Sequence, residues 1–378
     1  MSLWIALASA FAWAWLILLR GGFWRCAQND AGEGPPAPDV WPSVVAVVPA
    51  RNEADVVAQA IGSLRRQDYP GPFRILLVDD DSADGTAAAA RSASGTHPLE
   101  VLRGQRLAPG WTGKLWAQSQ GVARARDTDY LLLTDADIDH ERGSLRRLVA
   151  RAEAGRLSLV SLMARLTVRS GWERLLIPTF VFFFQMLFPF AWVNDPKRRT
   201  AAAAGGCMLV RRNALEAAGG IASIRGEIID DCALARELKA QGPIWLGLSK
   251  RVQSLRPYSS LGEIARMVAR SAYAQLGYSP LLLLGTVAGM ALVFAAPPLL
   301  FLFAHGPAKT IGLVTWLVMA LAMRPMLRFY RLWGAWGAAL PLAGGLYGAF
   351  TLWSAVQSWR GRGGQWKGRA QDAPSLAA

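Results

Sequence analysis

The sequence predicts an α/β protein whose mostly parallel sheet is flanked by helices and joined to membrane-spanning segments near both ends of the chain. From Ser43 onward, short apolar or β-branched runs alternate with amphipathic runs, which is the pattern of repeated β-α-β units. Long apolar stretches lie near both termini. The composition agrees, because 52% of the residues are apolar and only 18% are charged, which is oily for a soluble protein.

The charge balance indicates anionic partners. The net charge is +14, from 41 Lys and Arg against 27 Asp and Glu, which suits a lipid surface, a nucleotide diphosphate or nucleic acid. Nucleic acid is not expected, because no nucleic-acid-binding sequence pattern accompanies the charge. The three cysteines lack metal-site spacing and are too few for a disulfide framework, and the three histidines are scattered.

Residues 1–20 are predicted to form an uncleaved membrane anchor. The stretch Leu3–Leu19 is almost entirely apolar and lies near the lower length limit for a spanning helix. A cleaved signal peptide would carry positive charges before its apolar region, whereas Arg20 and Arg25 follow it here. The positive-inside rule therefore places the next domain in the cytoplasm. Residues 21–42 are rich in Gly and Pro and are predicted to be a linker.

A cytoplasmic domain is predicted over residues 43–275. Strands are expected at Val44–Val48, where Pro49 stops the run, and then at Arg74–Val78, near Leu99–Leu102 and at Tyr130–Leu133. The intervening segments have helical periodicity, as in Glu53–Arg66. Short connections between such units predict a mostly parallel sheet covered on both faces.

One segment of this domain, residues 172–193, is hydrophobic but contains Pro178, Gln185 and Pro189. A spanning helix is possible there. Helices that lie on the bilayer surface are the favoured interpretation.

Residues 280–357 are predicted to cross the membrane two or three times. Leu281–Phe303 and Gly334–Val356 are each long enough to span, whereas Thr310–Met323 is shorter and runs into charged residues. Three spans would place the basic tail, residues 358–378, outside the cytoplasm against the positive-inside preference, and two would place it inside. The sequence leaves both arrangements open, and it predicts that the tail is partly disordered.

Two carboxylates follow the strand at Tyr130–Leu133. Asp135 and Asp137 are one residue apart, so on an extended segment both side chains face the same way, at the sheet edge where open α/β sheets bind ligands. With no lysine beside them in the sequence, their repulsion requires a cation between them. Hard oxygen ligands of this kind suit Mg²⁺ or Mn²⁺ that bridges to phosphates. A solvated strand-to-loop turn is the alternative.

Four further polar segments are candidates for a site. Pro49–Glu53 is either a helix start or part of a site, and the acid-rich segment Asp79–Thr86 is dense in charge for a mere turn. Gly110–Lys114 presents a lysine that could meet a phosphate or simply be solvated. Asp230 and Asp231 open a predicted helix that runs to Lys239. Acids at a helix start are often caps, yet a poorly solvated carboxylate is also a competent general base.

Taken together, these segments resemble the ordered signature of family 2 glycosyltransferases with the GT-A fold, a Rossmann-like sheet flanked by helices. The resemblance covers roughly Ser43–Ala274. The whole-chain layout is most similar to the bacterial hopanoid (hopene)-associated membrane glycosyltransferases. The segments that carry the family resemblance are Pro49–Glu53, Asp79–Thr86, Gly113–Lys114, Asp135–Asp137, Gly205–Gly206 and Asp230–Asp231. The loop Gly110–Ala117 is part of the similarity in layout.

The resemblance assigns roles to individual residues. Asp231 takes the place of the catalytic base, and Asp137, with Asp135, serves the metal–diphosphate centre with Mg²⁺ or Mn²⁺. Gly205, Gly206 and Asp230 lie on the acceptor side. The residues implied to bind the nucleotide-sugar are Pro49, Arg51, Glu53, Asp79, Asp80, Lys114, Asp135 and Arg270.

The implied function is inverting, non-processive transfer of one sugar from a nucleotide-diphosphate sugar, with a uridine diphosphate sugar expected, to a membrane lipid such as a hopanoid. Processive members carry Gln-x-x-Arg-Trp after the base, whereas the nearest match here, Met267–Ser271, keeps only Arg270. The alternatives are a processive polysaccharide synthase, a sugar-phosphate nucleotidyltransferase and a non-catalytic lipid-binding membrane protein. The expected location is the bacterial inner (cytoplasmic) membrane, as a multi-pass protein with its catalytic domain facing the cytoplasm. The sequence does not determine the sugar, the lipid or the oligomeric state.

Overall fold

A computed structural model describes residues 1–361, 365–366 and 369–370, and the chain divides into two compact units. We call Gln28–Thr167 with Trp192–Arg256 the sheet unit. We call Met1–Ala27 and Val168–Ala191, with the residues from Pro257 to 361, the helical unit. This division differs from the continuous domain expected over 43–275, because two segments of that range pack with the terminal helices.

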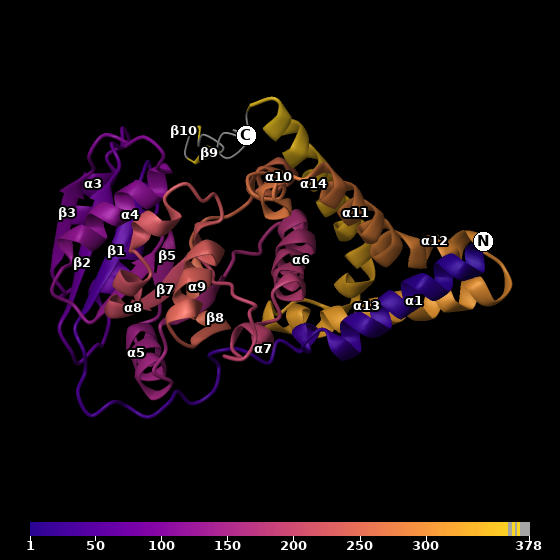
Figure 1. The fold of residues 1–378 in the computed structure, drawn as a ribbon, viewed down its shortest axis with the longest axis horizontal. Helices are drawn as coiled ribbons and strands as arrows, with labels where there is room; N and C mark the ends of the chain where they lie inside the picture. The colour runs from indigo at the N-terminus through magenta and orange to yellow at the C-terminus, as the bar shows by residue number, and fades with distance from the viewer. Residues whose placement is uncertain (362–364, 367–368, 371–378) are drawn as a thin grey trace. The chain divides into compact units, whose positions relative to one another are not determined.

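The sheet unit is built on one eight-stranded mixed sheet in the order β3-β2-β1-β4-β7-β6-β8-β5 (Figure 1). The first four strands in this order run parallel, while β7 pairs antiparallel with both β4 and β6. β8 then runs parallel to β6, and β5 antiparallel to β8. The strands are β1 (Val44–Ala50), β2 (Phe73–Asp79), β3 (Leu99–Arg103), β4 (Tyr130–Thr134), β5 (Ile138–His140), β6 (Leu159–Arg165), β7 (Cys207–Arg211) and β8 (Ile244–Ser254).

Helices cover both faces of this sheet, which explains why its central strands are continuous apolar runs. Every residue of β1 and β4 is buried. Alternate residues of β1 share one core with α2 (Val57–Arg65), α3 (Thr86–Arg91) and α5 (Ser144–Ala154). On the opposite face α4 (Gly113–Arg124) lies so close that a Cβ on Gly121 would be 2.4 Å from Val47.

The strand register brings the polar segments to one edge of the sheet. Ala50, the last residue of β1, pairs with Asp79, the last of β2. Thr134, which ends β4, pairs with Cys207, which begins β7. The segments that follow β1, β2 and β4 therefore meet the segment that precedes β7. Helices α8 (Arg212–Ala217) and α9 (Asp230–Gln241) follow β7.

The predicted linker is packed where it enters the sheet unit. The Asp30 amide donates to the Leu248 carbonyl at 3.0 Å, and the Leu248 amide donates to the Gln28 carbonyl at 2.9 Å. The Ser249 hydroxyl donates to the Asp30 carboxylate at 2.5 Å. This segment therefore adds to the edge of β8.

The helical unit contains four helices long and apolar enough to cross a membrane: Ser2–Leu19, Pro280–Phe303, Gly306–Phe329 and Gly334–Trp359. Three of these follow residue 280, so the stretch predicted as short, Thr310–Met323, belongs to a helix of 24 residues. It is longer than predicted because it continues through Pro325 and its neighbouring arginines. The predicted disorder of the tail falls at residues 371–378, outside the described residues.

The helices of this unit include α6, which the sequence analysis placed on the bilayer surface. It has 17 residues and is not among the four candidate spans. Leu175 and Leu176 pack in a core with Tyr347 and Phe350. The surface location itself stays a prediction. The helices are α1 (Ser2–Leu19), α6 (Gly171–Leu187), α7 (Phe190–Val193, which ends in the sheet unit), α10 (Leu261–Ala269), α11 (Pro280–Met290), α12 (Ala296–Phe303), α13 (Gly306–Phe329) and α14 (Leu340–Trp359).

One candidate span is interrupted, and α1 compensates for the interruption. Between α11 and α12 the residues Ala291–Ala295 form a π-helical turn. Pro297 lacks the amide that would normally bond the carbonyl of Val293, four residues earlier. The Trp13 indole donates to that carbonyl at 2.8 Å. Because an unpaired carbonyl in hydrocarbon costs several kcal/mol, this bond stabilises the break.

Candidate active site

The loops that follow β1 and β2 are bonded to each other at the sheet edge. The Asn52 amide donates to the Ser82 hydroxyl, and the Ala83 amide donates to the Asn52 side chain, both at 3.0 Å. The Glu53 amide donates to the Thr86 hydroxyl at 2.9 Å. Asn52 has φ of 51°, in the left-handed region that asparagine tolerates. Hydrogen bonds thus join the segments Pro49–Glu53 and Asp79–Thr86 to each other.

Three acids of the Asp79–Thr86 segment have different surroundings. Asp80 is 1% exposed and lies 3.5 Å from the Arg51 guanidinium, which also donates to the Asp80 carbonyl. Asp79 accepts from the Ser82 amide at 3.1 Å. Asp84 closes the turn that begins α3, and hydrogen bonds from Thr86 and the Ala54 amide outweigh desolvation and lower its pKa. Asp84 therefore has a structural role, and the pair Arg51–Asp80 is the buried charged element of this loop.

Lys114 connects the carboxylates of two distant segments. Its ammonium lies 3.0 Å from Asp135 and 3.0 Å from Asp230. Burial alone would lower the pKa of Lys114, but these carboxylates and Asp231 raise it above its ordinary value. Burial raises the pKa of Asp135, and Lys114 opposes that effect. Part of the positive charge that the sequence analysis assigned to a bound cation therefore comes from the chain itself.

Asp231 is held by two backbone amides at the start of α9. One carboxylate oxygen accepts from the Gly205 amide at 2.9 Å, and the other accepts from the Cys232 amide at 2.7 Å. Burial and the neighbouring Asp230 raise the pKa of Asp231 to about 6, while Lys114 and the two amides oppose the shift. A fixed carboxylate with a pKa near the working pH has the properties of a general base.

A side chain at position 205 would fit tightly against the charged cluster. A Cβ there would lie 3.2 Å from the Lys114 ammonium and 3.4 Å from the Asp231 carboxylate. A Cβ on Gly206 would lie 3.1 Å from Ile138. Gly205 and Gly206 thus leave room for the charged cluster and for the strand that follows Asp137.

Arg256 is a site residue that the sequence analysis missed. Its guanidinium is hydrogen-bonded to the Glu53 carboxylate and lies 3.5 Å from the Asp137 carboxylate. It follows β8 and is far in the sequence from both partners. The one signal in the sequence was a lone arginine before Pro257, which marks no motif.

The carboxylates suit a divalent cation only if other ligands complete its coordination. Within the described parts of the chain, no three His, Cys, Asp or Glu side chains are grouped to hold a metal. Asp135 and Asp137 offer one or two carboxylates. That donor set fits Mg²⁺ or Mn²⁺, which keep several waters and bind through one or two carboxylates plus substrate phosphates.

Pro49 and Arg270, which are predicted to bind the nucleotide-sugar, belong to a strand and to the end of a helix. Pro49 is inside β1 and pairs with Val78, so the strand extends past the proline predicted to stop it. Arg270 directly follows the last residue of α10, in the helical unit.

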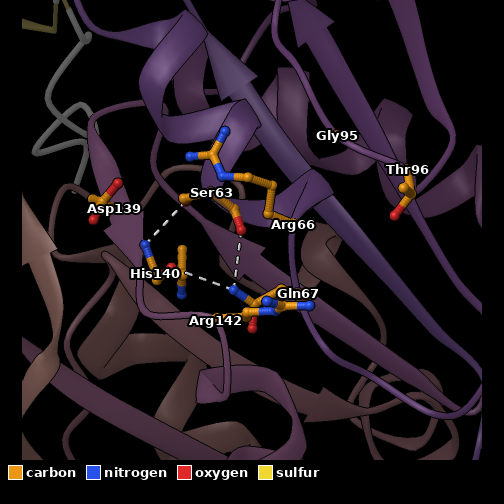
Figure 2. A pocket seen from close by; sticks show the side chains of 8 residues that line it. All are labelled: Ser63, Arg66, Gln67, Gly95, Thr96, Asp139, His140 and Arg142. Carbon is orange, nitrogen blue, oxygen red and sulfur yellow. Dashed lines mark hydrogen bonds between the residues drawn. The ribbon is translucent and has the colours of Figure 1, made fainter.

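A separate hollow of about 440 Å³ lies beside α2 and β5 (Figure 2). Figure 2 shows His140 bonded to Ser63, with Arg66 and Arg142 around the hollow. None of the predicted site residues lines it. Burial lowers the pKa of His140 to about 4, so this histidine is neutral, and it bonds Thr134 at 3.0 Å. It supports the end of β4.

Comparison with known proteins extends these observations. Residues 45–219 match the family model described as glycosyl transferase family 2. The match includes Asp80, Lys114 and Asp137 but ends before Asp231 and Arg256.

Two curated relatives match part of the chain. The succinoglycan biosynthesis protein ExoO of Rhizobium meliloti is 32% identical over 120 residues, which is 32% of each chain. The beta-monoglucosyldiacylglycerol synthase of Synechocystis sp. is 33% identical over 111 residues, 29% of this chain and 22% of that protein. The chain thus spans about a third or less of the length of these relatives.

A solved structure matches almost the whole chain. The mannosyltransferase PcManGT of Pyrobaculum calidifontis, solved in complex with GDP-Man and Mn²⁺, has a TM-score of 0.54 and 20% identity over 95% of this chain and 99% of its own. At that identity the likeness shows the fold, which is the mixed sheet flanked by helices described above. Residues 45–219 therefore match the family 2 glycosyltransferase model, and the mixed sheet flanked by helices is a GT-A fold.

Proposed function

We propose that this protein transfers one sugar from a nucleotide-diphosphate sugar to a membrane lipid, with inversion at the anomeric carbon. The observation that carries the proposal is the carboxylate of Asp231. It is fixed by two backbone amides and has a pKa raised to about 6. Through Lys114, which contacts Asp230 and Asp135, it lies in the same charged cluster as the acids that follow β4.

Asp231 acts as the base in this proposal. It accepts the proton of the acceptor hydroxyl while the hydroxyl oxygen forms a bond to the anomeric carbon. The bond from that carbon to the diphosphate oxygen breaks, and the nucleotide diphosphate leaves. General-base catalysis of this kind contributes roughly 10²- to 10⁴-fold.

The donor side is assigned to the loops after β1 and β2. Asp79 or Asp80 holds the base and ribose of the nucleotide, and Pro49, Arg51 and Glu53 complete that side. Asp137, with Asp135, would hold Mg²⁺ or Mn²⁺. When bound, that ion neutralises the charge that develops on the leaving diphosphate. Lys114 lies beside the donor and holds Asp135 in place, and Arg270 is assigned to the diphosphate.

The acceptor side is assigned to Gly205, Gly206 and Asp230, with a lipid as acceptor. Four candidate membrane helices support a membrane-bound acceptor. A curated relative named as a beta-monoglucosyldiacylglycerol synthase supports a lipid. We propose a hopanoid acceptor, a uridine diphosphate sugar as donor, and a catalytic unit facing the cytoplasm from the bacterial inner membrane.

Three alternative functions are less well supported by the residues of this chain. A processive polysaccharide synthase would need the Gln and Trp that are missing around Arg270. A nucleotidyltransferase would carry a glycine-rich loop after its first strand, where this chain has Pro49–Glu53. A non-catalytic lipid-binding protein would leave the cluster around Lys114 without a purpose.

The test offers the full-length protein in detergent a panel of radiolabelled nucleotide-sugars and membrane lipid that contains hopanoids, with Mn²⁺ or with EDTA. We expect labelled lipid that carries a single sugar, formed with Mn²⁺ and lost with EDTA. Labelled polymer, released pyrophosphate or no product with any donor would each reject the proposal. A lipid other than a hopanoid in the product would reject that acceptor alone.

A further inference from the structure

Arg256 connects two carboxylates that the proposed function assigns to different tasks. Its guanidinium bonds Glu53, on the nucleotide side, and its Nε lies 3.5 Å from Oδ2 of Asp137, on the metal side. The three side chains are 33%, 11% and 19% exposed, respectively, so solvent screens these charges only partly. Arg256 therefore restrains Asp137 through a partly buried ion pair.

Asp135, the other acid that follows β4, also forms an ion pair. Asp135 lies 3.0 Å from the Lys114 ammonium. Each of the two acids that follow β4 therefore has a cationic side chain of this chain as a neighbour. These two cations offset part of the negative charge of Asp135 and Asp137, and they also pair with Asp230 and Glu53.

A divalent cation on Asp137 would meet Arg256 directly. The ion would bind carboxylate oxygen at about 2.0–2.2 Å, whereas the guanidinium stands 3.5 Å from one of the same oxygens. Two like charges this close repel each other strongly where water is scarce. Without further anions the ion must therefore compete with Arg256 for Asp137.

A diphosphate removes this competition. Its oxygens are anionic, they complete the coordination of Mg²⁺ or Mn²⁺, and they match the planar donors of arginine. Once a nucleotide diphosphate is present, the ion and the guanidinium have separate anionic partners.

We infer that Arg256 is a positioning residue that makes metal binding at Asp137 dependent on the nucleotide diphosphate. The inference rests on the proposed function, because it takes Asp137 as a metal ligand. It predicts strong coupling: Mn²⁺ binds weakly alone and tightly with the nucleotide, and by linkage the nucleotide gains the same factor from Mn²⁺.

The test measures Mn²⁺ binding by electron paramagnetic resonance on the full-length protein in detergent, with and without uridine diphosphate. For Arg256→Gln we expect Mn²⁺ to bind at least about five-fold more tightly than to the wild type without nucleotide, since the competing charge is gone. With uridine diphosphate present, Arg256→Gln should no longer bind Mn²⁺ more tightly than the wild type, because the variant has lost an arginine that pairs with the diphosphate. Arg256→Lys, which keeps the charge, should retain weak binding without nucleotide.

The matched control is Arg251→Gln. Arg251 pairs with Glu141 at 2.6 Å in the same unit. This variant loses one positive charge too, and its Mn²⁺ affinity should equal that of the wild type.

Equal or weaker Mn²⁺ binding by Arg256→Gln without nucleotide would overturn the inference and leave the proposed function standing. Tighter binding by both Arg256→Gln and Arg251→Gln would also overturn it, since net charge alone would then be the cause. If the wild type binds no Mn²⁺ even with uridine diphosphate, the metal assignment of the proposed function is wrong, and the inference falls with it.

Discussion

Asp231 gains its properties from its neighbours more than from its place in the sequence. Two amides fix its oxygens, burial and Asp230 raise its pKa, and Lys114 limits that rise. One of these neighbours, Gly205, has no side chain, and an added Cβ would crowd both charged groups. The site therefore depends on a small residue as much as on its charged ones.

The raised pKa of Asp231 predicts the pH dependence of the reaction. A base must be unprotonated, so kcat/KM should fall as the pH drops through about 6 and reach a plateau above it. The measurement is kcat/KM for the lipid acceptor from pH 5 to pH 8 at saturating metal. A flat profile across pH 6 would remove Asp231 as the titrating base.

At this scale the sequence predicted residue types better than their partners. Asp135, Asp137, Lys114 and Asp231 could be selected because each lies in a short polar motif at a strand or helix end. The contact of Lys114 with two carboxylates could not be predicted. One of the two, Asp230, lies more than a hundred residues away from Lys114 in the sequence. Arg256 was missed because a single arginine forms no local sequence pattern and its partners are far away in the sequence.

At the scale of elements, the site is an edge of the sheet supported by partly buried polar contacts behind it. Lys239 of α9 shows this most clearly. Its ammonium donates to the carbonyls of Val193 and Thr200 at 2.7 Å and of Asp195 at 3.2 Å. One lysine thereby organises the loop that leads to Gly205.

Lys239→Met is expected to destabilise the sheet unit by at least about 2 kcal/mol, because hydrogen bonds from charged donors contribute about 1.5–3 kcal/mol each. The apparent melting temperature of the protein in detergent should fall by several degrees. Arg236→Met, at an exposed position of the same helix, is the control and should melt as the wild type does. Identical melting of Lys239→Met and the control would show that the loop does not need this ammonium.

Strands were predicted more accurately than the packing of hydrophobic helices. The apolar runs after Ser43 formed strands where expected, because a short and nearly continuous hydrophobic run is the usual sequence pattern of a buried parallel strand. The antiparallel strand β7 and the ladder of β6, β7 and β8 depend on long-range pairing, which periodicity does not reveal. For α6, hydropathy did not show that its apolar side chains pack against α14.

At the scale of the whole molecule, the chain passes between the sheet unit and the helical unit several times. The first crossing follows Ala27, and others follow Thr167, Ala191 and Arg256. A sequence read in order predicts one catalytic domain between two membrane regions. It does not reveal that Val168–Ala191 belongs with the terminal helices, because that assignment depends on packing between segments far apart in the chain.

Asp231, at the start of α9, is the residue proposed to perform the chemistry at the sheet edge. Asp231→Asn keeps the size of the side chain and removes the base. Folding should survive the change. The pKa of Asp231 is raised in the folded protein, so ionisation of this carboxylate lowers the stability of the fold as the pH rises through about 6. A neutral Asn side chain does not lower the stability in this way at neutral pH.

The most direct measurement compares sugar transfer and uridine diphosphate binding by the wild type and Asp231→Asn at neutral pH. We predict that turnover falls by at least about 100-fold, while the dissociation constant for uridine diphosphate with Mn²⁺ stays within about two-fold, as expected for a residue that acts on the acceptor. Turnover at the wild-type rate in the Asn variant would contradict the account.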